Sequence, residues 1–182
     1  MELIARDLLN EGLLPKSVGG AYAQFDFDDF GELILAVLAT PRPTRAAHQL
    51  IEYRSLKPLT AKNKRELEVN RLAIEDRGLK LDLEKLKPFP NLGALFQADY
   101  TMGGELLDLI GSAIIHIDRS HPSAIVEWKD KTASVFGTLA SGKDGDFSPY
   151  KTNVLPIEAR WKLYMLVQAQ LSFFDSSGGY AR

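Results

Sequence analysis

Residues 112–117 read SAIIHI, residues 123–129 read SAIVEWK, and residues 132–139 read TASVFGTL. All three runs are rich in β-branched and apolar side chains, which favour strands. The short segments between them contain aspartate, serine and proline, which are typical of turns. Short strands joined by short turns predict an antiparallel meander over residues 112–140.

The middle run is predicted to have two different faces, because successive side chains of a strand point to opposite sides. Ile125 and Glu127 are expected on one side, and Val126 and Trp128 on the other. One face is apolar, whereas the other changes from apolar to charged toward its end. The run therefore ends in the triplet Glu127-Trp128-Lys129, the one constellation in the sequence that is typical of a catalytic strand end.

Helical spacing is found near both ends of the chain. Residues 2–10 are predicted to form a helix, because their apolar residues recur at helical intervals. Residues 153–174 are predicted to form a second, largely apolar helix, with Pro156 in its first turn. Residues 44–53, capped by Thr44, are a third predicted helix.

The segments between these helices are predicted as follows, and two of them have an alternative. Residues 21–27 alternate as a strand with an aromatic face. Residues 30–39 fit a buried strand or a helix capped by Asp28 or Asp29, and their leucine and alanine content favours the helix. Residues 60–77, with Thr60 as the cap, are predicted to be a helix followed by a strand or short extended piece to Glu84. The alternation of Leu67 with Val69 and of Leu72 with Ile74 leaves a strand as the alternative over residues 65–84.

These elements predict an α+β fold, in which a small antiparallel sheet (the meander of about 112–140) packs against N-terminal and C-terminal helices. A chain of 182 residues is long enough for one domain with a real core. Residues 1–182 are therefore expected to form a single domain. The Pro-rich loop 87–91, KPFPN, is the candidate for an internal seam.

The composition limits the classes of function. The net charge of −2 gives no general attraction to nucleic acid or to an anionic membrane, so nucleic acid is a partner only if a local basic patch exists. The chain has no cysteine, which excludes disulfides, thiolate catalysis and cysteine zinc sites. It has three histidines, too few to predict a histidine metal site. No cofactor is expected.

The sequence also predicts where the protein resides. The first residues lack the basic start and the long apolar core of a signal peptide. The longest apolar run, 33–39, is too short to span a bilayer. We therefore expect no membrane association, and a cytoplasmic protein or one assembled into a particle in the cytoplasm.

A carboxylate, any residue and a lysine at the end of an apolar strand, here Glu127-Trp128-Lys129, is similar to the core of PD-(D/E)xK nucleases. In that family an upstream aspartate and the carboxylate of the motif hold Mg²⁺, and the lysine orients the attacking water. The resemblance implies Asp108 or Asp118 as the upstream aspartate, with Glu127 and Lys129. Mg²⁺ would then be the cofactor.

Two features favour contacts with other proteins. Apolar side chains cover most of the circumference of the predicted helix 153–174, and such a helix is deeply buried or shared with a neighbouring subunit. Its candidate contact residues are Trp161, Tyr164 and Phe174. A locally basic segment supplies three further candidates for contact with an anion, a nucleic acid or a partner, namely Arg42, Arg45 and Arg54.

The sequence contains no complete nucleophile set, metal set or nucleotide-binding loop. It therefore favours a non-catalytic structural or interaction protein, a subunit of a larger assembly with other protein subunits in a homo- or hetero-oligomer. Small phage head–tail and tail components are similar to it in general make-up. A Mg²⁺-dependent nuclease of the PD-(D/E)xK type is one alternative. An inhibitor or adaptor that binds a nucleoprotein complex is another.

Overall fold

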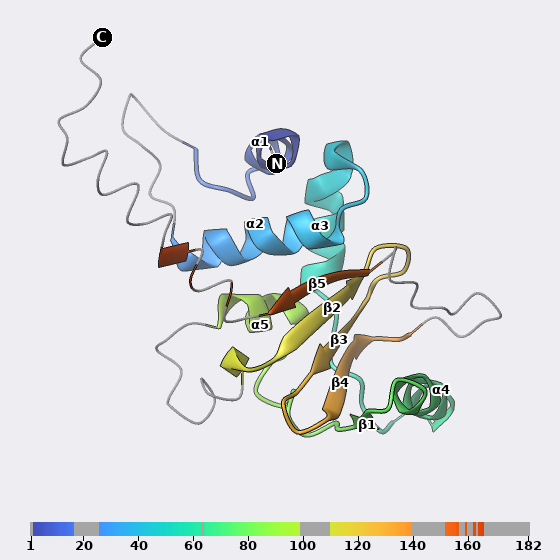
Figure 1. The fold of residues 1–182 in the computed structure, drawn as a ribbon. Coiled ribbons are helices and arrows are strands. Elements are labelled where there is room, and N and C mark those ends of the chain that lie inside the picture. Colours follow the sequence, from blue (N-terminus) through green and yellow to red (C-terminus); the bar gives the residue numbers. More distant parts are fainter. Residues whose placement is uncertain are drawn as a thin grey trace, which may run out of the picture.

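The computed structural model describes residues 2–16, 26–62, 64–98, 110–139 and 152–156, together with residues 159, 162, 164 and 165. The fold is α+β, as predicted. Helices gather on one side of a five-stranded mixed sheet, and a single helix, α4, lies apart from the others (Figure 1). No described helix has both the length and the apolar character needed to cross a membrane.

The predicted meander is confirmed. It consists of β2 (Ile114–Asp118), β3 (Ser123–Glu127) and β4 (Thr132–Gly137), each antiparallel to the next. A parallel strand of two residues, β1 (Lys80–Leu81), adds to β4, and β5 (Thr152–Pro156) adds antiparallel to β2. The strand order is β1-β4-β3-β2-β5, so the meander forms the centre of the sheet.

The two faces of the meander enter two separate hydrophobic clusters. Ala124 and Val126 of β3 belong to the larger cluster, between the sheet and helices α1, α2, α3 and α5. Ile125 belongs to the smaller cluster, which it shares with Val135 of β4 and with Ile74 of α4. The predicted alternation of residues 125–128 is therefore confirmed, and it decides which helices cover each face.

Helix α1 (Glu2–Asn10) agrees with the prediction. Helix α2 (Phe27–Ala39) shows that residues 30–39 are helical, but the predicted caps Asp28 and Asp29 are wrong. The N-cap is Asp26, whose extended backbone lets its side chain accept from the amide of Asp29 at 2.9 Å. The carboxylate of Asp29 in turn accepts from the amide of Asp26 at 3.1 Å. Asp26 and Phe27, the last two residues of the predicted strand 21–27, are therefore the N-cap and the first residue of α2, and residues 21–25 lie outside the described part.

Helix α3 (Ala46–Arg54) follows a short 3₁₀ turn, η1 (Pro43–Arg45). The predicted cap Thr44 is wrong, because the residue before α3 is Arg45 and its side chain makes no capping bond. The amide of Ala47 instead donates to the Asp7 carboxylate of α1 at 2.9 Å. An acidic side chain from another helix thus satisfies one of the free amides at the start of α3.

Helix α4 (Lys64–Glu75) is shorter than the predicted 60–77 and does not begin after Thr60. The chain leaves it through Gly78, whose φ of +72° belongs to the left-handed region that glycine adopts without strain. The extended piece predicted to reach Glu84 is only the two residues of β1. The buried side chain of Asn70 joins α4 to the sheet, because its oxygen accepts from the amide of Leu139 at 3.0 Å.

Helix α5 (Leu92–Gln97) begins at Asn91, whose side chain accepts from the amide of Ala94 at 2.8 Å. It lies against α2 where Gly31 meets the carbonyl of Phe96, a contact that leaves no room for a side chain at position 31. The Pro-rich loop 87–91 precedes α5, and its Phe89 is buried in the larger cluster. The seam predicted at this loop stays a prediction.

The predicted start of the C-terminal helix is wrong. Residues 152–156 form β5, and Pro156 ends this strand rather than opening a helix. The reason is tertiary, since Leu155 packs on the larger cluster and the Asn153 side chain donates to the carbonyl of Leu38 at 2.6 Å. The four described residues that follow, 159, 162, 164 and 165, are helical.

We expect Asn70→Leu to lower the free energy of unfolding by about 1–3 kcal/mol, because the substitution leaves the buried amide of Leu139 without an acceptor. Urea unfolding followed by circular dichroism measures the difference. The same substitution at the exposed Asn10, Asn10→Leu, is the control and should change the free energy by less than about 0.5 kcal/mol. Equal effects of the two substitutions would show that Asn70 does not hold α4 on the sheet.

Candidate functional site

The triplet Glu127-Trp128-Lys129 lies at the end of β3 and in the turn that leads to β4. Glu127 is partly buried, and its Oε2 atom lies 3.2 Å from Nε2 of His116 on β2. Trp128 points to the opposite side and is almost completely buried. Lys129 is exposed in the turn. The three side chains therefore point in different directions and have different environments.

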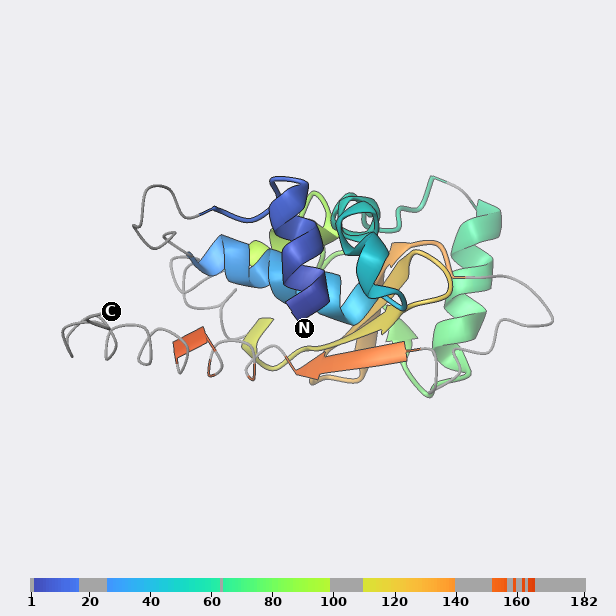
Figure 2. The ribbon, with the colours of Figure 1, turned by 90° about the horizontal axis from the view of Figure 1, so that it is seen from above.

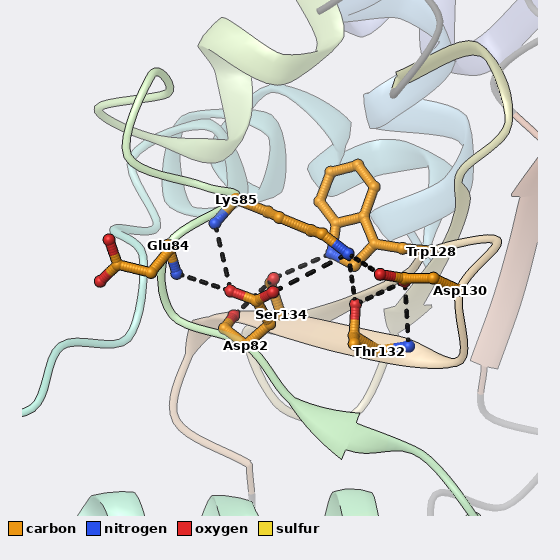
Figure 3. Close-up of polar contacts among 7 residues, drawn as sticks. All are labelled: Asp82, Glu84, Lys85, Trp128, Asp130, Thr132 and Ser134. Atoms are coloured by element: carbon orange, nitrogen blue, oxygen red, sulfur yellow. Dashed lines mark hydrogen bonds and ion pairs between the residues drawn. The ribbon is translucent and has the colours of Figure 1, made fainter.

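A polar network around Trp128 fixes the turn (Figure 3). The indole Nε1 donates to the Ser134 hydroxyl at 2.9 Å, and that hydroxyl donates to the carbonyl of Asp82 at 2.6 Å. Lys85 reaches across from the segment after β1, with its ammonium 5.8 Å from the centre of the Trp128 ring. The indole N–H of Trp128 and the hydroxyl of Ser134 thus both have hydrogen-bond acceptors, as buried polar groups require.

Lys85 also closes the turn from the outside (Figure 3). Its ammonium donates to Asp130 at 2.5 Å and to the hydroxyl of Thr132 at 2.6 Å, and it lies 3.8 Å from the Asp82 carboxylate. Asp130 in turn accepts from the hydroxyl of Thr132 at 2.8 Å. The ammonium of Lys85 and the Thr132 hydroxyl stabilise the ionised carboxylate and lower the pKa of Asp130 to about 2.

The carboxylates implied by the nuclease resemblance are not together in the described part of the chain. Asp118 pairs with Ser123 at one end of the β2–β3 ladder, and Glu127 pairs with Ile114 at the other end. Four strand positions separate them along the ladder, about 13 Å. Two oxygen ligands of one Mg²⁺ lie within about 4 Å of each other, since each is about 2.1 Å from the ion. Asp108, the other candidate, lies outside the described residues, so its pairing with Glu127 stays a prediction.

The described residues contain no group of three or more histidine, aspartate or glutamate side chains that could hold a metal ion. Asp118 is buried, and its Oδ1 atom accepts from both the amide (2.8 Å) and the hydroxyl (2.7 Å) of Ser120. The buried Tyr53 hydroxyl donates to the carbonyl of the same residue. Asp118 therefore shapes the β2–β3 turn and ties it to α3.

The surroundings of His116 lower its pKa and so favour its neutral form. Burial lowers the pKa of His116, and the nearby positive charge of Arg77 lowers it further, whereas the hydrogen bond to Glu127 raises it. Because the pKa is lowered on folding, the neutral imidazole stabilises the fold above its ordinary pKa of 6.5, and this stabilisation is lost as the pH falls. His116 and Glu127 are thus an oriented pair on the sheet face that α4 covers only in part.

The arginines predicted as contact residues have different surroundings. Arg54 forms an ion pair with Glu32 of α2 at 3.0 Å, so its charge is already matched within the chain. Arg42 and Arg45 are exposed at the 3₁₀ turn before α3. Arg45 also lines a groove of about 440 Å³ between α1 and the start of α3. The lining residues of this α1–α3 groove are Asp7, Glu11, Thr44, Arg45, Ala47, His48 and Ile51.

Tyr164 makes contacts within the chain. Its ring meets Phe27 edge-on, with the centroids 4.8 Å apart, and lies 5.5 Å from the ring of Phe30. These contacts attach the C-terminal helical residues to α2. Trp161 and Phe174 lie outside the described residues, so their predicted role in an interface stays a prediction.

Sequence reasoning missed several residues of these sites. Asn70 had a signal, because it lies on the same helical stripe as Leu67 and Ile74 and so on the buried side of α4. No local sequence pattern indicated the roles of Lys85 and Asp7, because their partners Asp130 and Ala47 are 45 and 40 residues away in the sequence.

The comparisons with known proteins found no match: no family model, no curated protein and no solved structure is significantly similar to this chain.

We expect Lys85→Met to raise the pKa of Asp130 from about 2 toward its ordinary value of 3.8, because the charged donor is lost while the apolar stem remains. Since the pKa is lowered on folding, ionised Asp130 stabilises the fold above pH 3.8 and loses this effect as the pH falls toward 2. NMR titration of the Asp130 carboxyl carbon measures the shift. Lys87→Met removes an exposed lysine nearby and should leave the titration of Asp130 unchanged; a shift of equal size would refute the role of Lys85.

Proposed function

We propose that the protein is a non-catalytic subunit of a larger assembly and that it binds a partner protein at the α1–α3 groove. The observation that carries the proposal is the chemistry of this groove. Its walls present two acidic side chains, Asp7 of α1 and Glu11 of the turn after α1, and two basic or titratable ones from the other side, Arg45 and His48. Exposed Ile51 adds an apolar surface.

The composition of the groove suits a protein partner. Interfaces between proteins combine a small apolar centre with a polar rim, and arginine is enriched in them. Ile51 supplies the apolar contact, with 48% of its surface exposed, and Arg45 supplies the arginine. The Asp7 carboxylate is already bonded to the Ala47 amide, so the groove wall is held in place before a partner arrives.

The partner is therefore expected to offer an apolar side chain with an acidic group beside it. The apolar side chain would cover Ile51, and the acidic group would pair with Arg45. An assembly of this kind, formed in the cytoplasm or within a particle, agrees with the general make-up of small phage head–tail components. That likeness is one of general composition and not of a sequence motif.

We expect Arg45→Glu to weaken binding of the partner at least tenfold, because the charge that attracts the acidic group is reversed. The full chain and the variant serve as paired baits for proteins of the source cells, and each retained protein is then purified and its affinity measured by calorimetry. Arg65→Glu makes the same charge change on the exposed start of α4 and is the matched control. A purified partner that binds all three forms equally would exclude the groove as the binding site.

The Mg²⁺-dependent nuclease remains the alternative, because Glu127 is held by His116 at the end of β3 and the exposed Lys129 follows it. Under the assembly proposal, DNA stays intact when it is incubated with the chain and Mg²⁺. Cleavage that requires Mg²⁺ and is lost in Glu127→Gln would support the nuclease and contradict the assembly role.

The third candidate, an inhibitor or adaptor, predicts a chain that binds a nucleoprotein complex and remains monomeric in light scattering.

A further inference from the structure

The two edges of the sheet differ in chemistry. At one edge lies β1, which has only two residues, carries the charge of Lys80 and packs against α4. Short length, charge and a covering helix are the usual means by which proteins protect an edge from pairing with another chain. At the other edge lies β5, with five residues and no charge (Thr-Asn-Val-Leu-Pro). Among the described elements, β5 pairs only with β2.

Strand β5 pairs with β2 on one side, and no described strand pairs with it on the other side. Leu155 packs on the larger cluster, and the side chain of Asn153 donates to the carbonyl of Leu38. Val154 points to the opposite face, where 51% of its surface is exposed. In Figure 2, β5 (orange) runs along the lower margin of the described structure, and the blue and cyan helices lie above it in the view. Strand β5 is therefore fixed to the fold by Asn153 and Leu155, while the side chain of Val154 is exposed.

We propose that β5 pairs antiparallel with β5 of a second copy of this chain, so that two sheets join into one. The proposal extends the assembly role above by naming a second copy as one of the partners, and in that respect it rests on that role. The backbone N–H and C=O groups along the outer edge of a strand can hydrogen-bond to a strand of another chain. A two-fold axis makes the two strands antiparallel and places the same surface of each copy in contact.

The sequence of β5 fits pairing with itself. With the axis at Val154, the central residue of the strand, each Val154 lies opposite the other. Two apolar side chains then cover one another, and no like charges are opposed within the strand. The β1 edge does not offer this arrangement, because it is short, charged and covered. Since five paired residues bury much less than the roughly 1,200 Å² of a stable interface, the dimer is expected to be weak and dependent on concentration.

A single cysteine tests the pairing and its register, because the natural chain contains no cysteine. Opposed residues of an antiparallel pair have Cβ atoms about 4.5–5.5 Å apart, close to the separation that a disulfide bridges. Val154→Cys is incubated with a mild thiol oxidant, and the disulfide-linked dimer is followed on a non-reducing gel. Leu72→Cys on α4, with 49% of Leu72 exposed, is the matched control for accessibility.

We expect Val154→Cys to form the linked dimer at least tenfold faster than Leu72→Cys, and added unmodified chain to slow it by competition. Equal rates for the two variants, or no effect of competitor, would overturn the proposal. As a second measurement, Val154→Lys should abolish the concentration-dependent rise in mass seen in light scattering, since two lysines would oppose each other, whereas Val154→Thr should keep it. A rise in mass that persists in Val154→Lys would also overturn it.

The groove variant separates this proposal from the function proposed above. Arg45→Glu should leave the crosslinking of Val154→Cys unchanged, because the groove lies on α1 and α3. If Val154→Cys does not crosslink while Arg45→Glu still loses its partner, only the pairing of β5 is refuted. If crosslinking occurs while no partner depends on Arg45, the groove is refuted and the dimer stands.

Discussion

Strand β3 is buried on both faces, and the arrangement of the remaining elements depends on this constraint. Ser123 to Val126 are all buried, although successive side chains point to opposite sides. Both faces of the strand therefore need a cover. The larger group of helices covers the side of Ala124 and Val126, and α4 covers the side of Ile125. An apolar strand at the centre of a sheet is stable only when both sides are removed from water.

The end of this strand shows how a catalytic-looking sequence can have a structural use. Trp128 lies within the fold, and the Lys85 network closes over it and fixes the turn to β4. This network joins residues 82–85 to residues 128–134, so it holds the segment after β1 against the meander. Glu127 and Lys129 flank Trp128, which is buried and whose indole N–H has a hydrogen-bond partner.

The two surfaces that we propose for binding partners, both formed by described residues, have different chemistry. The α1–α3 groove has charges of both signs beside an exposed isoleucine, which suits a different protein. The β5 edge offers backbone groups and an uncharged strand, which suits a second copy. The groove and the edge lie on different elements, so occupation of one leaves the other accessible. A subunit needs at least two such surfaces to connect partners into a larger structure.

The sequence by itself determined the α+β class, the three strands of the meander, the alternation of Ile125 with Val126, and the helix at residues 2–10. These depend on local periodicity and turn residues, which act within a few positions of the chain. Only the tertiary structure decided that residues 152–156 are a strand, that Asp7 bonds the start of α3, and that Lys85 closes over Trp128. The strand β5 exists because β2 offers a free edge and the larger cluster accepts Leu155. Its own five residues carry no sufficient signal, and a proline at its end reads equally well as the first turn of a helix. Asp7 and Lys85 bond to groups 40 or more residues away, so their roles follow from the packing of whole elements and not from any local pattern.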